Sequence, residues 1–282
     1  MKIIDARLRP PLKDYLRCNL YRDPKKTQAW SDNFLMKLSP AAEQRDAGLL
    51  YKEMDEAGVT LGVMTGRQSP DMGHVSNDDL MAIVTEQPSR FVGVAGVDGS
   101  NPAAALAEIE RTVVNGNLHA AGMEPGCGDI PMYVDDARLY PIYQYCMEHG
   151  IPMFLMGGGG NGPDLSFSNP EHIDRVCRDF PHLTIVNMHG SYPWIPQVLF
   201  SCMCHPNMYL APDMYMYNMP GVQDYVVAAN GFLKDRFLFG SGYPYIPLKQ
   251  AVDLFLEMPF REDVLPNVLY RNMAGVLGLD MD

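Results

Sequence analysis

Eight short apolar segments alternate with helical segments along the whole chain. The apolar segments lie at 2–10, 59–65, 91–97, 119–124, 151–156, 183–188, 208–210 and 237–240. Strands that alternate with helices are typical of a parallel sheet with helical crossovers. Eight such units in 282 residues predict an α/β fold, a (β/α)8 TIM barrel, formed by residues 1–282 as a single domain. An open, doubly wound sheet is the alternative, and it would have its site at one switch point.

The helical segments begin and end with residues that usually start and stop helices. Ser39 can cap a helix whose first turn contains Pro40 and which Gly58 would end, so a helix is expected at 40–57. A closing helix is expected at 262–277. These signals support the alternation of strands and helices.

The first segment and the stretch after it form a basic region in an acidic protein. Arg7 and Arg9 are two residues apart, which places both on one face of an extended strand. Residues 1–40 contain nine Lys and Arg against four Asp, a net charge of +5, whereas the whole chain carries −12. Residues 10–39 are longer than most connections. We therefore expect 10–39 to be an ordered, basic lid loop over the mouth of the barrel.

Composition argues against several kinds of partner. A net charge of −12 disfavours nucleic acid and anionic membranes. No apolar run approaches the roughly 20 residues of a membrane span, and the start of the chain does not read as a signal peptide. Six cysteines make no disulfide framework in a chain of this length, so we expect reduced cysteines and a cytoplasmic protein. The glycine run at 157–160 lacks the Lys-Ser/Thr of a Walker motif, and no cofactor is expected.

Polar side chains follow most of the expected strands, at the end where TIM barrels have their active sites. His189 is the leading catalytic candidate, because an imidazole directly after a buried strand can act as a general acid or base near neutral pH. Glu124 ends a buried strand and needs a partner, so a salt bridge to an arginine and a catalytic role are both open. Cys127 is a weaker candidate nucleophile, since no base lies near it in the sequence.

A further pattern is spread over five stretches of the chain. They are DARLRP at 5–10, IPMFLMG at 151–157, FPHLTIVNMHG at 180–190, RFLFGSGYP at 236–244 and NMAGVLGL at 272–279. In this order they resemble the amidohydrolase-2 family, a branch of the amidohydrolase superfamily with metal-dependent hydrolases and decarboxylases. The resemblance spans the whole chain and implies the TIM barrel. It also implies a homo-oligomer, because barrels of this family often form dimers or tetramers.

The residues with which that family binds its metal are mostly replaced here. The resemblance implies His-x-His after the first strand, where this chain has Arg7 and Arg9, and a histidine after the fifth, where it has Met156. The family's aspartate after the eighth strand is Gly242, and only the histidine after the sixth remains, as His189. Arginine is not an ordinary metal ligand, and one imidazole holds a divalent cation poorly. We therefore expect no metal site and no metal-activated water.

Two hypotheses of function remain. In the first, the protein is an enzyme that acts without metal on a small carboxylate substrate, with arginines holding the anion and His189 moving the proton. Hydrolysis of a lactone or related ester is the leading chemistry, and decarboxylation or C–C cleavage is the alternative. In the second, the protein is a non-catalytic, anion-binding barrel. We assign catalytic roles to His189, Arg7 and Arg9, and substrate-binding roles to Arg67, Glu124, Met156, Asp213 and Tyr243.

Overall fold

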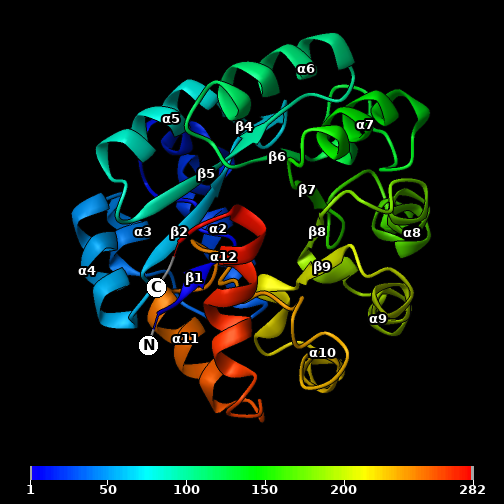
Figure 1. Cartoon of the computed structure of the whole chain (residues 1–282). Helices are drawn as coiled ribbons and strands as arrows, with labels where there is room; N and C mark the ends of the chain where they lie inside the picture. Colours follow the sequence, from blue (N-terminus) through cyan, green and yellow to red (C-terminus); the bar gives the residue numbers. More distant parts are fainter. Residues whose placement is uncertain (1, 281–282) are drawn as a thin grey trace.

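The computed structural model describes residues 2–280, and its centre is a curled parallel sheet (Figure 1). Seven strands follow one another in the order β1-β2-β5-β6-β7-β8-β9, and every neighbouring pair is parallel. Their bounds are β1 Ile4–Asp5, β2 Leu61–Thr65, β5 Phe91–Gly96, β6 Ala120–Met123, β7 Met153–Met156, β8 Ile185–Met188 and β9 Met208–Ala211. Six of these strands lie within the expected apolar segments, and β9 extends one residue beyond the seventh segment, 208–210.

The eighth apolar segment, 237–240, joins the two edges of this sheet without forming a full strand. Isolated parallel bridges connect Phe237 to β9 and Tyr243 to the residues after β1. The N–H of Phe239 donates to the carbonyl of Val268 at 2.9 Å, so it is not available to a strand ladder. Because residues 237–243 pair with β9 on one side and with the residues directly after β1 on the other, the sheet closes into the predicted TIM barrel, and the open, doubly wound alternative is wrong.

Helices surround the sheet, as Figure 1 shows. They are α4 Ala47–Ala57, α5 Asn77–Glu86, α6 Pro102–Ile109, α7 Tyr140–Glu148, α8 Pro170–Asp179, α9 Ile195–Cys204, α10 Val222–Ala229 and α11 Leu248–Glu257. Short 3₁₀ turns occur at η1 Lys13–Arg17, η3 Pro125–Cys127, η4 Ala137–Leu139, η5 Leu165–Ser168, η6 His189–Ser191 and η7 Asp213–Met216. Polar caps start several helices; for example, the Asn101 side chain accepts from the N–H of Ala104.

The helix expected at 40–57 is two helices, α3 Pro40–Gln44 and α4. Arg45 ends the first one in the left-handed conformation, with φ 55°. Asp46 then starts the second by accepting a hydrogen bond from the N–H of Leu49. The capping residue after the break was visible in the sequence, but the conformation of Arg45 was not.

The inside of the barrel is filled by apolar side chains and sealed at one end by α12 Asn272–Leu277, which follows the π-helical turn η8 Asn267–Arg271. These two elements correspond to the closing helix expected at 262–277. The interior cluster contains Ile4, Ala6, Val63, Val92, Val94, Ala120, Phe154, Met156, Val186, Met188, Ala211, Leu238, Met273, Ala274, Val276 and Leu277. The barrel is therefore a packed core with one open end.

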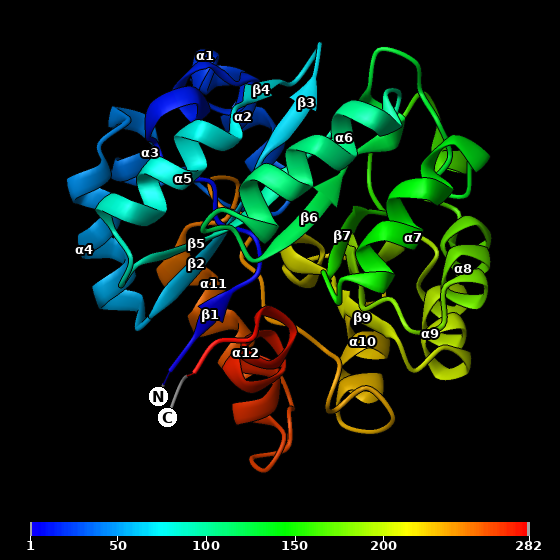
Figure 2. The ribbon, with the colours of Figure 1, turned by 45° about the horizontal axis from the view of Figure 1, so that its top comes forward.

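The open end carries the N-terminal segment (Figure 2). Helices α1 Asn19–Arg22 and α2 Pro24–Asp32 lie there, next to a hairpin of β3 Arg67–Ser69 and β4 Gly73–Val75. The stretch expected as a loop at 10–39 thus contains short helices, and the hairpin was not predicted. Among residues 2–280, no helix has the length and apolar character needed to cross a membrane.

Candidate active site

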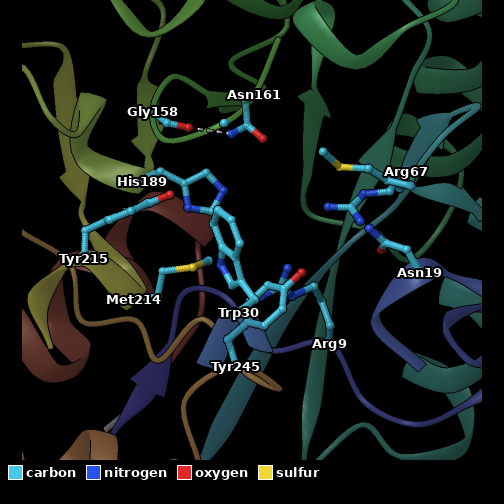
Figure 3. A pocket seen from close by; sticks show the side chains of 12 residues that line it. Arg9, Asn19, Trp30, Arg67, Gly158, Asn161, His189, Met214, Tyr215 and Tyr245 are labelled. Atoms are coloured by element: carbon cyan, nitrogen blue, oxygen red, sulfur yellow. Dashed lines mark hydrogen bonds between the residues drawn. The ribbon is translucent and has the colours of Figure 1, made fainter. Parts of the chain in front are cut away.

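One pocket of about 310 Å³ opens among the residues at this end of the barrel (Figure 3). Cationic, amide, aromatic and imidazole groups share its wall. The lining residues are Arg9, Asn19, Trp30, Arg67, Met72, Gly158, Gly160, Asn161, His189, Met214, Tyr215 and Tyr245. Since three of the expected site residues are among them, this pocket is the candidate active site.

His189 and Asp213 form a pair at the wall of the pocket. Nδ1 of His189 lies 3.0 Å from Oδ1 of Asp213, in a hydrogen bond, and 2.7 Å from Oδ2. The second oxygen does not accept a well-aligned hydrogen bond. Asp213 is fully buried behind the ring. A carboxylate at Nδ1 favours the tautomer with its proton there, which leaves Nε2 to exchange a proton with a ligand.

The backbone around this pair is in a conformation that non-glycine residues rarely adopt. His189 has φ 63° and Ser191 has φ 52°, on either side of Gly190, and Asp213 has φ 43°. Left-handed backbone at three non-glycine residues is unfavourable, and such residues are concentrated at functional sites. The fold therefore accepts backbone strain in order to hold the imidazole and the carboxylate face to face.

Glu124 lies between two arginines. Arg67 contacts both of its oxygens, with Nε 2.9 Å from Oε2 and Nη2 3.1 Å from Oε1, and Nη2 of Arg7 lies 3.1 Å from Oε1. Arg7 also donates to the hydroxyl of Thr65. Burial alone would raise the pKa of Glu124, but Arg67 and Arg7 hold it at about 2. Glu124 in turn raises the pKa of Arg67 against the opposite effect of burial. This ionised triad builds one wall of the site.

Arg9 is held differently, by backbone oxygens. Its Nε donates to the carbonyl of Tyr243 at 2.8 Å and its Nη2 to that of Gly242 at 2.6 Å. The guanidinium also lies over the ring of Tyr245, 5.1 Å from the ring centre. Arg9 is 3% exposed, and no carboxylate of residues 2–280 lies within 4.0 Å of it. Burial, and next to it the charge of Arg7, lowers the pKa of Arg9 to about 10.

The structure brings some of the expected site residues to the pocket and places others behind them. Arg9, Arg67 and His189 line it. Behind the wall, Glu124 forms a salt bridge with Arg67, and Arg7 forms one with Glu124. Asp213 lies behind His189 and contacts its Nδ1. The remaining two do not reach the wall: Met156 is part of the barrel interior, and Tyr243 is buried with its hydroxyl 3.2 Å from that of Ser39.

The weaker candidate, Cys127, is poorly suited to act as a nucleophile. Burial, together with the charge of Glu124, raises the pKa of this thiol to about 12. The reactive thiolate is therefore scarce at neutral pH.

Several lining residues were missed from the sequence. Gly158 and Gly160 belong to the glycine run after β7 and Asn161 directly follows it, so their position after a strand was a usable signal. Met214, Tyr215 and Tyr245 lie one or two residues from sites that were named, so they too could have been proposed. Asn19, Trp30 and Met72 come from α1, α2 and the turn of the hairpin, whose packing over the barrel could not be read from the sequence.

Comparison with known proteins identifies the family of the chain. The family model for Amidohydrolase, of the amidohydrolase-2 type, matches residues 4–279. The chain belongs to the amidohydrolase-2 family. Its expected resemblance to this family is thereby confirmed.

Solved structures of the same fold include one close relative and several more distant ones. The uncharacterized TIM-barrel protein Bb4693 from Bordetella bronchiseptica is 40% identical, with 99% of each chain covered and a TM-score of 0.96. The 5-carboxyvanillate decarboxylase LigW from Sphingomonas paucimobilis is 18% identical, with 99% of each chain covered and a TM-score of 0.70. A manganese-bound dihydroxybenzoic acid decarboxylase from Polaromonas sp. JS666 is 18% identical over 98% of this chain and 97% of that one, with a TM-score of 0.72.

A shorter match is to 2-amino-3-carboxymuconate-6-semialdehyde decarboxylase of Dictyostelium discoideum. It is 26% identical over 85 residues, which are 30% of this chain and 23% of that protein. The match thus spans less than a quarter of the relative's length.

The residues of this amidohydrolase-2 chain do not fit the divalent metal that the family resemblance implies. At the expected ligand positions stand Arg7, Arg9, Met156 and Gly242, which offer two cations, a thioether and no side chain. Within residues 2–280 there is no group of three or more His, Cys, Asp or Glu side chains arranged to hold a metal ion. Gly242 has φ +74°, and a Cβ there would lie 2.7 Å from the Cβ of Met214. We therefore derive no reaction step through a metal.

The purified protein should contain much less than one equivalent of zinc, manganese or iron. Elemental analysis after expression in metal-supplemented medium checks this, with a mononuclear metal-dependent family member purified in parallel as the control. About one metal per chain, lost together with function when Arg9 or His189 is replaced, would contradict the expectation.

Proposed function

We propose that this protein is a decarboxylase that acts, without a metal ion, on a small, planar, unsaturated carboxylic acid. The observation that carries the proposal is that His189, backed by Asp213, lines the same pocket as Arg67 (Figure 3). A proton donor and a carboxylate-binding cation are the two groups that a simple decarboxylation needs. The aromatic rings of Trp30 and Tyr245 on the wall suit a flat ligand.

The reaction can be written with these residues in order. Arg67, fixed by its two contacts to Glu124, holds the carboxylate through Nη1, which makes no hydrogen bond within residues 2–280. His189, in the form protonated on both ring nitrogens, transfers the proton of Nε2 to the carbon that bears the carboxylate, so that a C–H bond forms. The C–C bond then breaks, CO₂ leaves, and its electron pair restores the unsaturated system. A solvent proton returns to His189, and the reaction needs no oxidant or reductant.

The comparisons support decarboxylation over the lactone hydrolysis that leads on sequence grounds alone. The Dictyostelium relative and the two named enzymes of the same fold are decarboxylases, although the structural matches at 18% identity speak for the fold alone. Lactone hydrolysis remains the second candidate. His189 backed by Asp213 is also the arrangement of a general base, which could activate water against a lactone carbonyl.

A panel of substrates tests these assignments. Hydroxybenzoates, carboxylated muconate-like acids and the corresponding lactones are incubated with the wild-type protein, and CO₂ release and product mass are measured. Release of CO₂ with one C–H bond gained supports decarboxylation. A gain of one water without CO₂ would replace the proposal by lactone hydrolysis. Binding of the acids without turnover of any compound would favour the non-catalytic, anion-binding barrel.

A further inference from the structure

Two guanidinium groups on the pocket wall each retain one nitrogen without a partner in the protein. Arg9 uses Nε and Nη2 for the carbonyls of Tyr243 and Gly242, and Arg67 uses Nε and Nη2 for Glu124. Neither Nη1 makes a hydrogen bond within residues 2–280, and neither is among the fully buried polar atoms that lack one. Since both residues line the pocket, each Nη1 can donate into it.

The charges around the pocket do not balance. Arg7 and Arg67 share the single carboxylate of Glu124, and the carboxylate of Asp213 is paired with His189. Arg9 has no carboxylate within 4.0 Å among the described residues, although it is almost completely buried. A buried cation without an anion is unfavourable unless a ligand supplies one.

We infer that Arg9 is a second anion-binding subsite, apart from the one at Arg67, and that the pocket takes a planar ligand with two carboxylates. This inference rests on the proposed function in one respect, because the first carboxylate is the reacting one held by Arg67. The second carboxylate is not consumed and serves to orient the ring against Trp30 and Tyr245.

The way in which Arg9 is fixed suits a binding role. Two carbonyl oxygens and the Tyr245 ring hold the guanidinium, so its free nitrogen loses little freedom when a ligand binds. With a pKa of about 10, Arg9 is charged at neutral pH. A purely structural tie to the two carbonyls and the Tyr245 ring would leave Nη1 of Arg9 without a hydrogen-bond partner.

The test compares dicarboxylates with their own monoamides on the wild-type protein. Phthalate, isophthalate and terephthalate vary the spacing of the two anions, and in each monoamide one anion becomes a neutral group of the same shape. Isothermal titration should show at least one dicarboxylate binding roughly 10- to 100-fold more tightly than its monoamide, the range of a charge-assisted hydrogen bond. Equal affinity within all three pairs, or no binding of any dicarboxylate, would overturn the inference.

Variants of Arg9 test whether its side chain causes the preference for the dicarboxylate. Arg9→Met should abolish the preference for the dicarboxylate over its monoamide, measured in the same titrations. Arg9→Lys retains the charge and should keep part of the preference, so it decides the case if Arg9→Met does not fold. A preference that is unchanged in the folded variants would contradict the subsite.

The subsite and the proposed function fail in different ways. A preference for dicarboxylates without CO₂ release from any acid would remove the decarboxylase and leave the subsite. Release of CO₂ from monocarboxylates, with no preference for dicarboxylates in the titrations, would support the decarboxylase and remove the subsite.

Discussion

Replacing Glu124 with alanine should lower the free energy of unfolding by about 3–5 kcal/mol, the usual consequence of breaking a buried ion pair from one side. The variant would leave Arg7 and Arg67, whose side chains are 1% and 8% exposed, without their common carboxylate. Both guanidiniums are almost completely buried, so solvent can compensate only little for the lost carboxylate. Urea denaturation followed by circular dichroism measures the loss.

Asp55→Ala is the matched control. Asp55 also binds an arginine through both oxygens, with Arg90 nitrogens at 2.9 and 3.2 Å, but this pair lies on the surface. Exposed ion pairs contribute little, so the denaturation midpoint should hardly change. A loss in Glu124→Ala no larger than that in Asp55→Ala would show that the buried triad does not stabilise the fold.

The same triad sets part of the acid stability. The pKa of Glu124 in the folded protein, about 2, is below its usual value, so its contribution is complete above about pH 4.5 and is lost as the pH falls toward 2. Glu124→Gln cannot titrate at this position. Thermal midpoints measured between pH 5 and 2 should therefore fall more steeply in the wild type than in this variant.

His189→Asn should reduce kcat for the decarboxylated substrate by about 10²- to 10⁴-fold, the range for loss of a positioned acid or base. Asp213→Asn should reduce kcat as well and change its pH profile, because Asp213 holds the ring through Nδ1 and does not itself line the pocket. Steady-state kinetics with CO₂ detection measures both effects.

A second His–Asp pair of this protein provides the control. Nδ1 of His172 lies 2.7 Å from Oδ1 of Asp135, away from the pocket wall. His172→Asn should leave kcat and its pH profile unchanged. If it lowered kcat as much as His189→Asn does, the effect would reflect general stability, and His189 would lose its catalytic assignment.

The barrel could be predicted from the sequence because each strand is a short apolar run and the helices between them have readable starts. Where the prediction was incomplete, contacts between residues far apart in the sequence determined the local structure. The hairpin of β3 and β4 has no apolar alternation, and its turn is fixed by α1, through the N–H of Asn19 and the carbonyl of Met72 at 3.0 Å. Similarly, the bond from Phe239 to Val268 prevents a full eighth strand.

The candidate site was also predicted only in part, because the sequence shows which residues follow a strand but not the distances between them. Position after a strand indicated Arg9, Arg67 and His189, since that rule depends on the fold alone. The sequence could not show that Arg7 and Arg67 share Glu124 while Arg9 has no carboxylate, because this depends on distances across the barrel. Trp30 reaches the pocket from α2 by the same kind of long-range packing.

The conformation of Gly242 bears on whether an aspartate can stand at this position. At +74°, its φ strains any L-residue, and a new Cβ would collide with Met214 at 2.7 Å. A single substitution of Gly242 by the aspartate that the family has there would therefore destabilise the fold, whether or not a metal then bound. Met214 and the turn around it would have to change first, with no benefit of their own. An aspartate at position 242 would thus need a changed turn around Met214 as well, and a substitution of Gly242 alone does not restore the ligand that the family resemblance implies there.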